Sequence, residues 1–176
     1  ELEARIQAAL TLVEVEDLYR PYRPKRRTRA LIAKEKGLEP FADLILLQQT
    51  KEPLEKAAEA YISQEKGVMT AQDAIAGAMD ILAERISDNA EYRTYIRKQT
   101  VSQGMLQSAA KDEKVKSVYE MYYNYEKPVK KAAGHRILAL NRGENEKILT
   151  VKIAAPEEQI LRYLEKKTIV RDNPYT

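Results

Sequence analysis

The sequence predicts a mainly α-helical fold, a multi-helix array with a helix-turn-helix-like elbow and room for one short β-strand. The chain is rich in alanine, leucine, glutamate and lysine, which favour helices over strands. Apolar residues recur at three- and four-residue intervals, most clearly at Ile75, Ala78 and Leu82, and prolines and glycines separate such stretches. With 44% hydrophobic and 32% charged residues, the composition is typical of a globular chain.

Four helices are expected in the first part of the chain, over residues 2–19, 28–36, 41–49 and 53–66. Pro21 and Pro24 exclude a regular helix between the first two, because each lacks an amide hydrogen and restrains the residue before it. Thr28 suits an N-cap, and Gly37 is well placed to end the helix that Thr28 starts. Pro40 suits the first turn of the next helix.

The clearest helix is expected over residues 71–86, where Thr70 and Asp73 resemble a capping box. Its apolar face, with Ile75, Ala78 and Leu82, is predicted to face the core. The rest of the chain predicts helices over 90–99, 114–125, 135–141 and 157–167, turns at 128–134 and 143–145, and a strand over 148–153.

The chain is expected to be part of a longer protein. It begins at Glu1, within a helical pattern and without an initiator methionine, and stops at Thr176, just after a helical pattern. We expect a helical domain over residues 1–127 and a continuation over residues 128–176 toward a domain outside this chain.

Neither catalysis nor metal binding is predicted. The absence of cysteine excludes disulfides, thiolate zinc sites and a cysteine nucleophile. His135 is the single histidine and has no nucleophile pattern beside it, so we interpret it as a packing or capping residue. Asp73, Asp80 and Glu84 share one helical stripe, which is open to three interpretations: a solvated face, which is the default, internal ion pairs with basic residues, or a metal site. We expect no cofactor, and no membrane partner because no apolar run approaches about 18 residues.

The most distinctive stretch is a basic segment over residues 20–29, with six basic residues and no acidic one. The candidate nucleic-acid-binding residues are Arg23, Lys25, Arg26, Arg27, Arg29, Tyr19 and Tyr22. Guanidinium groups suit phosphate oxygens, tyrosine rings offer stacking surfaces for single-stranded bases, and prolines stiffen the connection. The alternative is an internal strut whose arginines bind helix ends or acids such as Asp17 or Glu35. The sequence leaves both open.

Tyrosine is common, with 11 copies against one phenylalanine. Tyr119, Tyr122 and Tyr123 would share one face of the helix expected over 114–125, with Tyr125 close behind. We interpret them as half-buried packing residues rather than base-stacking ones.

Residues 32–38 fit the elbow of a helix-turn-helix, with a small residue for close packing and Gly37 for the turn. A helix that reads bases should carry arginine, asparagine or glutamine early, whereas Phe41, Leu44 and Leu47 make the second helix apolar. We therefore interpret this feature as a structural elbow.

Three blocks of the sequence resemble the Tex family of bacterial transcription accessory proteins. The first covers residues 18–41, above all Leu18-Tyr19, Pro21-Tyr22, 24–29 and 36–40, and is specific. The blocks at 74–84 and 135–144 support it. Together they sample nearly the whole chain in the order expected of the family.

The resemblance implies a larger cytoplasmic protein that binds RNA or DNA and acts around transcription. In that family the helical N-terminal part precedes an RNase H-like domain, helix-hairpin-helix elements and an OB-fold RNA-binding domain. The main RNA or DNA contacts are thus expected outside this chain, and residues 128–176 would lead toward the RNase H-like domain. We expect a non-catalytic scaffold domain; the alternative is a protein-interaction module that docks on the transcription machinery through an apolar or tyrosine-lined groove.

Overall fold

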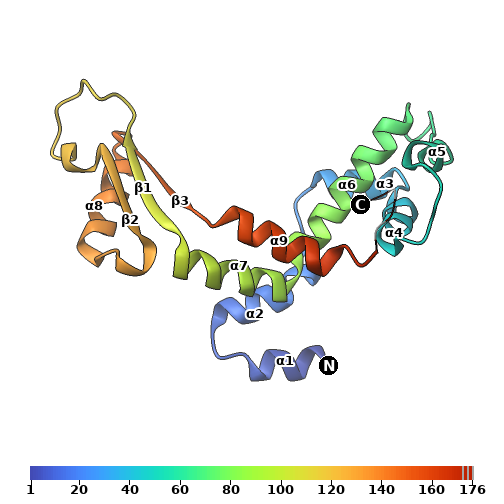
Figure 1. Cartoon of the computed structure of the whole chain (residues 1–176), viewed down its shortest axis with the longest axis horizontal. Coiled ribbons are helices and arrows are strands. Elements are labelled where there is room, and N and C mark those ends of the chain that lie inside the picture. The colour runs from blue at the N-terminus through green and yellow to red at the C-terminus, as the bar shows by residue number, and fades with distance from the viewer. Residues whose placement is uncertain (172, 174, 176) are drawn as a thin grey trace. The chain divides into compact units, whose positions relative to one another are not determined.

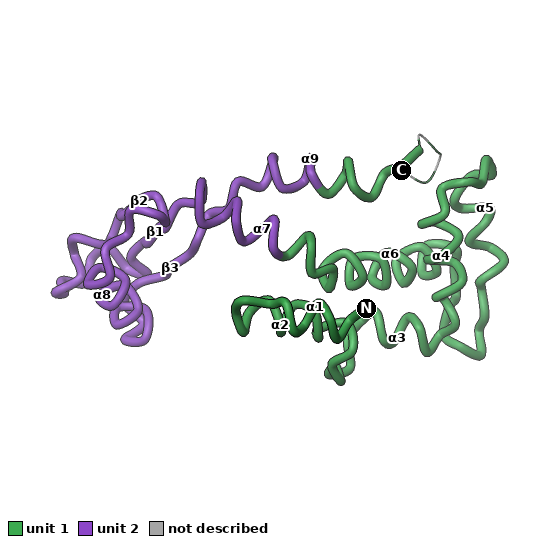
Figure 2. Tube along the Cα trace, turned by 90° about the horizontal axis from the view of Figure 1, so that it is seen from below, with its two compact units in different colours: residues 1–93, 164–176 green, residues 94–163 purple. Residues whose placement is uncertain are grey.

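The computed structural model describes residues 1–171, 173 and 175 and separates into two compact units. Unit 1 comprises Glu1–Arg93 and Leu164–Thr176, and unit 2 comprises Thr94–Tyr163 (Figure 2). Helices predominate and one small sheet is present (Figure 1), which confirms the predicted mainly α-helical class. The boundary placed between residues 127 and 128 falls inside unit 2, within a strand of its sheet.

Unit 1 contains most of the helices. They are α1 (Leu2–Ala8), α2 (Leu12–Tyr19), α3 (Arg29–Glu35), α4 (Glu39–Leu47), α5 (Leu54–Glu59) and α6 (Ala71–Asp88), with the start of α7 (Ala90–Gln103) and the end of α9 (Glu157–Thr168). The single helix expected over residues 2–19 is wrong. Ala9 is extended, and the Thr11 hydroxyl accepts a hydrogen bond from the Glu14 amide at 3.3 Å, so Thr11 caps a second helix.

α3 and α4 are joined by residues 36–38. The Thr28 hydroxyl accepts a hydrogen bond from the Leu31 amide at 3.1 Å, which confirms Thr28 as the N-cap of α3. Gly37 has a φ of +80°, a conformation that L side chains rarely adopt, and it ends the helix as predicted. Pro40 lies in the first turn of α4, also as predicted.

α5 stops at Glu59, so the helix expected to reach residue 66 is too long. Beyond it, Ser63 and Val68 form an antiparallel bridge through two backbone hydrogen bonds of 2.9 Å. Gly67, with a φ of +69°, lies in the turn that this bridge closes. Gly67 therefore serves a tight turn rather than the end of a helix.

α6 begins with the predicted capping box. The Thr70 hydroxyl accepts a hydrogen bond from the Asp73 amide at 3.1 Å, and the Asp73 carboxylate accepts one from the Thr70 amide at 3.0 Å. Hydrogen bonds from Thr70 hold the pKa of Asp73 below its ordinary value, because they stabilise the charged carboxylate.

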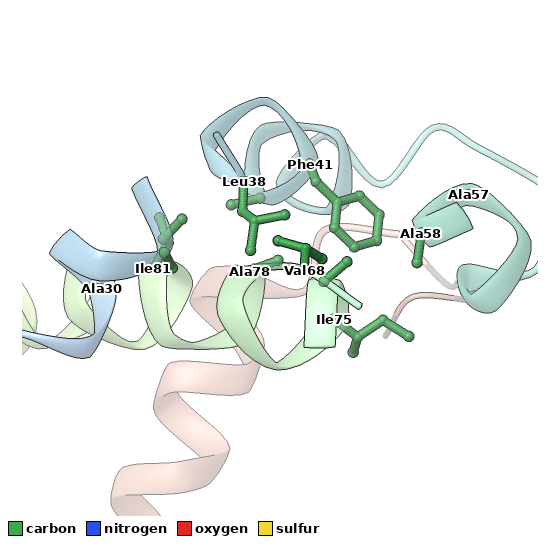
Figure 3. Close-up of a cluster of buried hydrophobic side chains, with 12 residues drawn as sticks. Ala30, Leu38, Phe41, Ala57, Ala58, Val68, Ile75, Ala78 and Ile81 are labelled. Carbon is green, nitrogen blue, oxygen red and sulfur yellow. The ribbon is translucent and has the colours of Figure 1, made fainter. Parts of the chain in front are cut away.

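The core of unit 1 forms where α6 packs against α3, α4 and α5. Ile75 and Ala78 are buried as predicted, while Leu82 is only half-buried at the edge of the same cluster. A Cβ on Gly77 would lie 2.3 Å from Leu38 Cδ1, so the missing side chain lets α6 approach Leu38 closely. The fully buried members of this cluster (Figure 3) are Ala30, Ala33, Leu38, Phe41, Ala42, Ala57, Ala58, Val68, Ala74, Ile75, Ala78 and Ile81.

Unit 2 is built on a three-stranded antiparallel sheet of order β2-β1-β3. Its elements are β1 (Met105–Ala110), β2 (Asn124–Pro128), β3 (Leu149–Ala154) and the helix α8 (Gly134–Asn145). One sheet face packs against α8, and the buried cluster there contains Leu106, Tyr119, Tyr122, Leu140 and Leu149. The strand expected over 148–153 is confirmed as β3, and the helix expected over 157–167 is confirmed as α9.

The helix expected over residues 114–125 is wrong. This stretch contains turns, a 3-10 turn η2 (Glu120–Tyr122) and the start of β2. Tyr119 and Tyr122 are buried in the unit 2 cluster, so the packing interpretation of these tyrosines is confirmed although their helical context is not. Pairing with β1 and burial against the sheet outweigh the local helical spacing here.

The turn expected over 143–145 is also wrong, because α8 continues to Asn145. Gly143 lies inside the helix and is buried. A Cβ there would lie 2.7 Å from Leu149 Cδ1 and 3.2 Å from a Tyr119 ring carbon. Glycine at this position therefore serves close packing of α8 against its neighbours rather than a turn.

Candidate nucleic-acid interface

Residues 20–29, which we call the basic strap, comprise the connection between α2 and α3 and the first residue of α3. It opens with a 3-10 turn, η1 (Arg20–Tyr22), in which Pro21 lies in the first turn. From Arg23 the backbone is extended, with φ −69° and ψ 134°. The prolines thus keep the strap out of a regular helix, as the sequence predicts.

The strap is held by acidic residues on one stripe of α6. Asp80, Glu84 and Asp88 are spaced by four residues, which places them on the same side of the helix. The strap runs antiparallel to this stripe, because Arg20 pairs with Asp88 near its start and Arg29 pairs with Asp80 at its end.

The tightest contacts involve Asp88 and Glu84. Asp88 Oδ1 accepts a hydrogen bond from Arg20 Nε at 2.9 Å, and its other oxygen accepts one from Lys25 Nζ. Glu84 lies 3.2 Å from Lys25 Nζ and accepts a hydrogen bond from the Thr28 hydroxyl at 2.9 Å. Burial lowers the pKa of Lys25, but the hydrogen bonds and charges of Asp88 and Glu84 outweigh it and raise that pKa above its ordinary value.

Two further strap arginines pair loosely. Arg27 Nη2 lies 3.2 Å from Glu35, and Arg29 Nε lies 3.4 Å from Asp80. Their side chains remain 72% and 86% exposed. Exposed ion pairs contribute little because solvent screens them, so these guanidinium groups stay available to an anion.

Arg23 and Arg26 differ from the rest of the strap. Within the part of the chain that the structure describes, neither side chain makes a hydrogen bond or an ion pair. Both are exposed, and both line an open pocket of about 380 Å³ between the strap and the end of α6. Tyr19 and Tyr22 are exposed as well. The two interpretations of the segment therefore apply to different residues: Arg20 and Lys25 are internal struts, whereas Arg23 and Arg26 are unengaged.

Several expectations about the acidic residues are now settled. The ion-pair interpretation of Asp80 and Glu84 is confirmed, so the solvated-face interpretation is wrong for them. Glu35 does pair with the strap, through Arg27. Asp17 is buried and accepts a hydrogen bond from Arg93 Nε at 2.6 Å. Asp88, which pairs with both Arg20 and Lys25, lies beyond the helix end expected at residue 86.

The other features that the sequence singled out are a metal site, His135 and the apolar face of α4. Across residues 1–171, 173 and 175, no group of three histidine, aspartate or glutamate side chains is arranged to hold a metal. His135 is exposed in the first turn of α8. Phe41 and Ala42 are buried, so α4 presents that face to the core. Among the described residues, every helix is too short or too polar to cross a bilayer.

Replacing Asp88 with asparagine should destabilise the chain by about 1.5–3 kcal/mol, the usual contribution of a hydrogen bond to a charged group. Asp88 is 10% exposed at its side chain and accepts from both Arg20 and Lys25, so the variant loses two charge-assisted bonds. The measurement is the urea midpoint of unfolding. Asp80→Asn is the matched control, because its partner Arg29 is exposed. Equal midpoints for D88N and D80N would show that the strap is not held by Asp88.

Sequence comparison with known proteins identifies relatives of this chain. A Bacillus subtilis protein named uncharacterized protein YdcI is 50% identical over 171 residues, which cover 96% of this chain and 24% of that protein. Transcriptional accessory protein Tex of Neisseria gonorrhoeae is 35% identical over 155 residues, 87% of this chain and 20% of its own length. Human S1 RNA-binding domain-containing protein 1 is 33% identical over 153 residues, 81% of this chain and 15% of its own length.

The chain spans only 15% to 24% of the length of these relatives. The sequence model described as Tex central region-like matches residues 48–172, which include α5, α6 and all of unit 2. The resemblance inferred from the three sequence blocks is thereby confirmed, and the chain belongs to the Tex central region-like family.

Proposed function

We propose that this chain is a non-catalytic helical scaffold domain of a nucleic-acid-binding transcription accessory protein. Support comes from membership of the Tex central region-like family and from relatives whose names refer to transcription and to RNA binding. The scaffold would position domains outside this chain, which make the main contacts to RNA or DNA. A cytoplasmic location belongs to the same proposal.

The basic strap would add phosphate contacts of its own. The observation that carries this step is the pair of exposed, unengaged guanidinium groups of Arg23 and Arg26, which line one pocket. Arg27 and Arg29 would join them at little cost, because their ion pairs are exposed. Lys25 pairs with Asp88 and Glu84, so it would hold the strap in place rather than contact a phosphate directly.

Exposed rings of Tyr19 and Tyr22 would stack on bases of a single strand beside those phosphates. Every base offers a ring face and every nucleotide a phosphate, so this binding would be independent of sequence. It would weaken as the salt concentration rises, because each phosphate contact releases counterions.

Replacing Arg23 and Arg26 with alanine should weaken binding of all single-stranded sequences alike. At about 0.7 per phosphate contact, the loss of two contacts should flatten the log–log salt slope by about 1.4. Fluorescence anisotropy of a labelled single-stranded RNA, titrated with the chain at several salt concentrations, measures both quantities.

The matched control is Arg5→Ala with Lys51→Ala, which removes the same charge from exposed positions elsewhere in unit 1. If both double variants change the affinity and slope equally, the strap has no special role. Thermal unfolding should be unaffected by R23A/R26A, because neither side chain has an internal partner in the described part of the chain.

A second candidate function is docking on a protein of the transcription machinery. The buried Tyr119 and Tyr122 do not offer the tyrosine-lined groove that this alternative requires. By contrast, Leu10 lies between α1 and α2, Leu12 begins α2, and both side chains are exposed. This exposure favours an apolar contact there. Binding through these leucines would depend little on salt, whereas phosphate binding would depend on it steeply.

A further inference from the structure

The net charge is positive in unit 2 and negative in unit 1, although unit 1 carries the basic strap. Residues 94–163 contain 13 lysines and arginines against 8 aspartates and glutamates, a net charge of +5. Because the whole chain has a net charge of +3, unit 1 has a net charge of −2. Acidic residues thus outnumber basic ones in unit 1 as a whole, although the strap is basic.

Most of the positive charge in unit 2 is not neutralised by a neighbour. Arg162 forms an ion pair with Glu158, and Arg97 is not counted among the unpaired cations because it also has a partner. Among the residues that the structure describes, the other lysines and arginines of unit 2 have no carboxylate within 4.0 Å. The strap shows the opposite arrangement, since most of its cations are paired with acids.

Four of these unpaired cations lie together around the start of α8. The segment 127–136 contains no acidic residue and holds Lys127, Lys130, Lys131 and Arg136, all exposed. Lys130 and Lys131 lie in the 3-10 turn η3 (Val129–Lys131), which connects the end of β2 to α8 (Figure 1).

The other two cations, Arg136 and Lys127, both lie near Tyr125 of β2. The Arg136 guanidinium carbon lies 5.9 Å from the centre of the Tyr125 ring on β2. Lys127 is two residues further along the same strand, so its side chain leaves the same sheet face roughly 7 Å away. We call Lys127, Lys130, Lys131 and Arg136 the α8 basic cluster.

We propose that the α8 basic cluster binds the phosphate backbone of a nucleic acid, as a second contact surface separate from the strap. The proposal deepens the nucleic-acid association proposed above and rests on it. Several unpaired cations around one turn match the phosphates of a strand, whereas a neutral or cationic partner would leave them unsatisfied. Tyr125 is already covered by Arg136, so this surface contacts phosphates without stacking on bases.

The test compares two double variants of the 176-residue chain that remove equal charge from the same unit. K130A/K131A removes two members of the α8 basic cluster, and K114A/K116A removes two exposed lysines from the loop that also carries Asp112 and Glu113. Anisotropy of a labelled single-stranded RNA is measured as a function of salt. We expect K130A/K131A to lower the affinity on the order of tenfold and to flatten the log–log salt slope by about 1.4, and K114A/K116A to change both far less.

Charge-conserving and alternative-ligand controls sharpen the result. K130R/K131R should retain the affinity, because the charge is kept. Equal effects of K130A/K131A and K114A/K116A, with R23A/R26A still weakening binding, would overturn the cluster and leave the strap standing. Loss with K130A/K131A but not with R23A/R26A would support the cluster and overturn the strap. Lysine-dependent binding to phosphatidylserine vesicles, without RNA binding, would assign the surface to a membrane and overturn the proposal.

Discussion

Replacing Phe41 with alanine should destabilise unit 1 by about 3–5 kcal/mol, the usual cost of truncating a fully buried aromatic residue. Phe41 is 0% exposed, and its ring stacks on Tyr61 with centroids 4.7 Å apart. Ala58 lies near the ring in the core, on the side away from the larger Val68 (Figure 3). Alanines cannot extend into the space that the ring leaves, so a cavity would remain and its cost would add to the lost burial.

The urea midpoint of unfolding measures this effect. Leu47→Ala is the control, because Leu47 lies on the same helix with an exposed side chain and should cost little. Leu82, which the sequence predicts to face the core, is only half-buried, so truncating Leu82 should cost clearly less than truncating Phe41. A Phe41→Ala midpoint equal to that of Leu47→Ala would mean that this cluster is not the core of unit 1.

The features that sequence reasoning found were those set by local chemistry. The capping box at Thr70 and Asp73, the N-cap Thr28 and the left-handed Gly37 each depend on residues within four positions. Such contacts are available to the chain before any tertiary structure forms. The burial of Ile75 and Ala78 followed from helical spacing in the same way.

The sheet of unit 2 was missed because its strands pair across long distances in the sequence. β1 pairs with β3, with partners from Ala110 and Leu149 to Met105 and Ala154, and its short sequence has no strong strand composition of its own. Tyr119 and Tyr122 have helical spacing, yet both are buried against the sheet. Local spacing cannot reveal a partner strand, so the sequence did not predict β1 and β2.

In the candidate site, too, the local features could be predicted from the sequence and the tertiary contacts could not. The sequence identified the strap and placed Asp80 and Glu84 on one helical stripe, with ion pairs to basic residues as one of three interpretations. Extending that stripe by four residues reaches Asp88, which lies beyond the helix end predicted at residue 86. The sequence could not show that Arg23 and Arg26 stay unpaired while Arg20 and Lys25 do not, because this depends on how the strap lies against α6.

Replacing Leu149 with alanine should destabilise unit 2 by about 2–5 kcal/mol. Leu149 is 0% exposed at the start of β3, and its side chain packs against the bare backbone of Gly143 in α8. The fully buried cluster of unit 2 has only two other aliphatic members, Leu106 and Leu140. The loss of one side chain therefore removes a large share of the contacts between the sheet and α8.

Hydrogen exchange followed by mass spectrometry separates this effect from changes in unit 1, because peptides from β1 and β3 report on the sheet and peptides from α6 do not. A loss of 2 kcal/mol or more should speed exchange at the sheet amides by at least about thirtyfold. Ile153→Ala is the control, since Ile153 lies on the same strand with a side chain that is 55% exposed. The buried clusters of the two units share no residue, so α6 should keep its protection in L149A. Equal acceleration in α6 would instead mean that the two cores unfold as one cooperative unit.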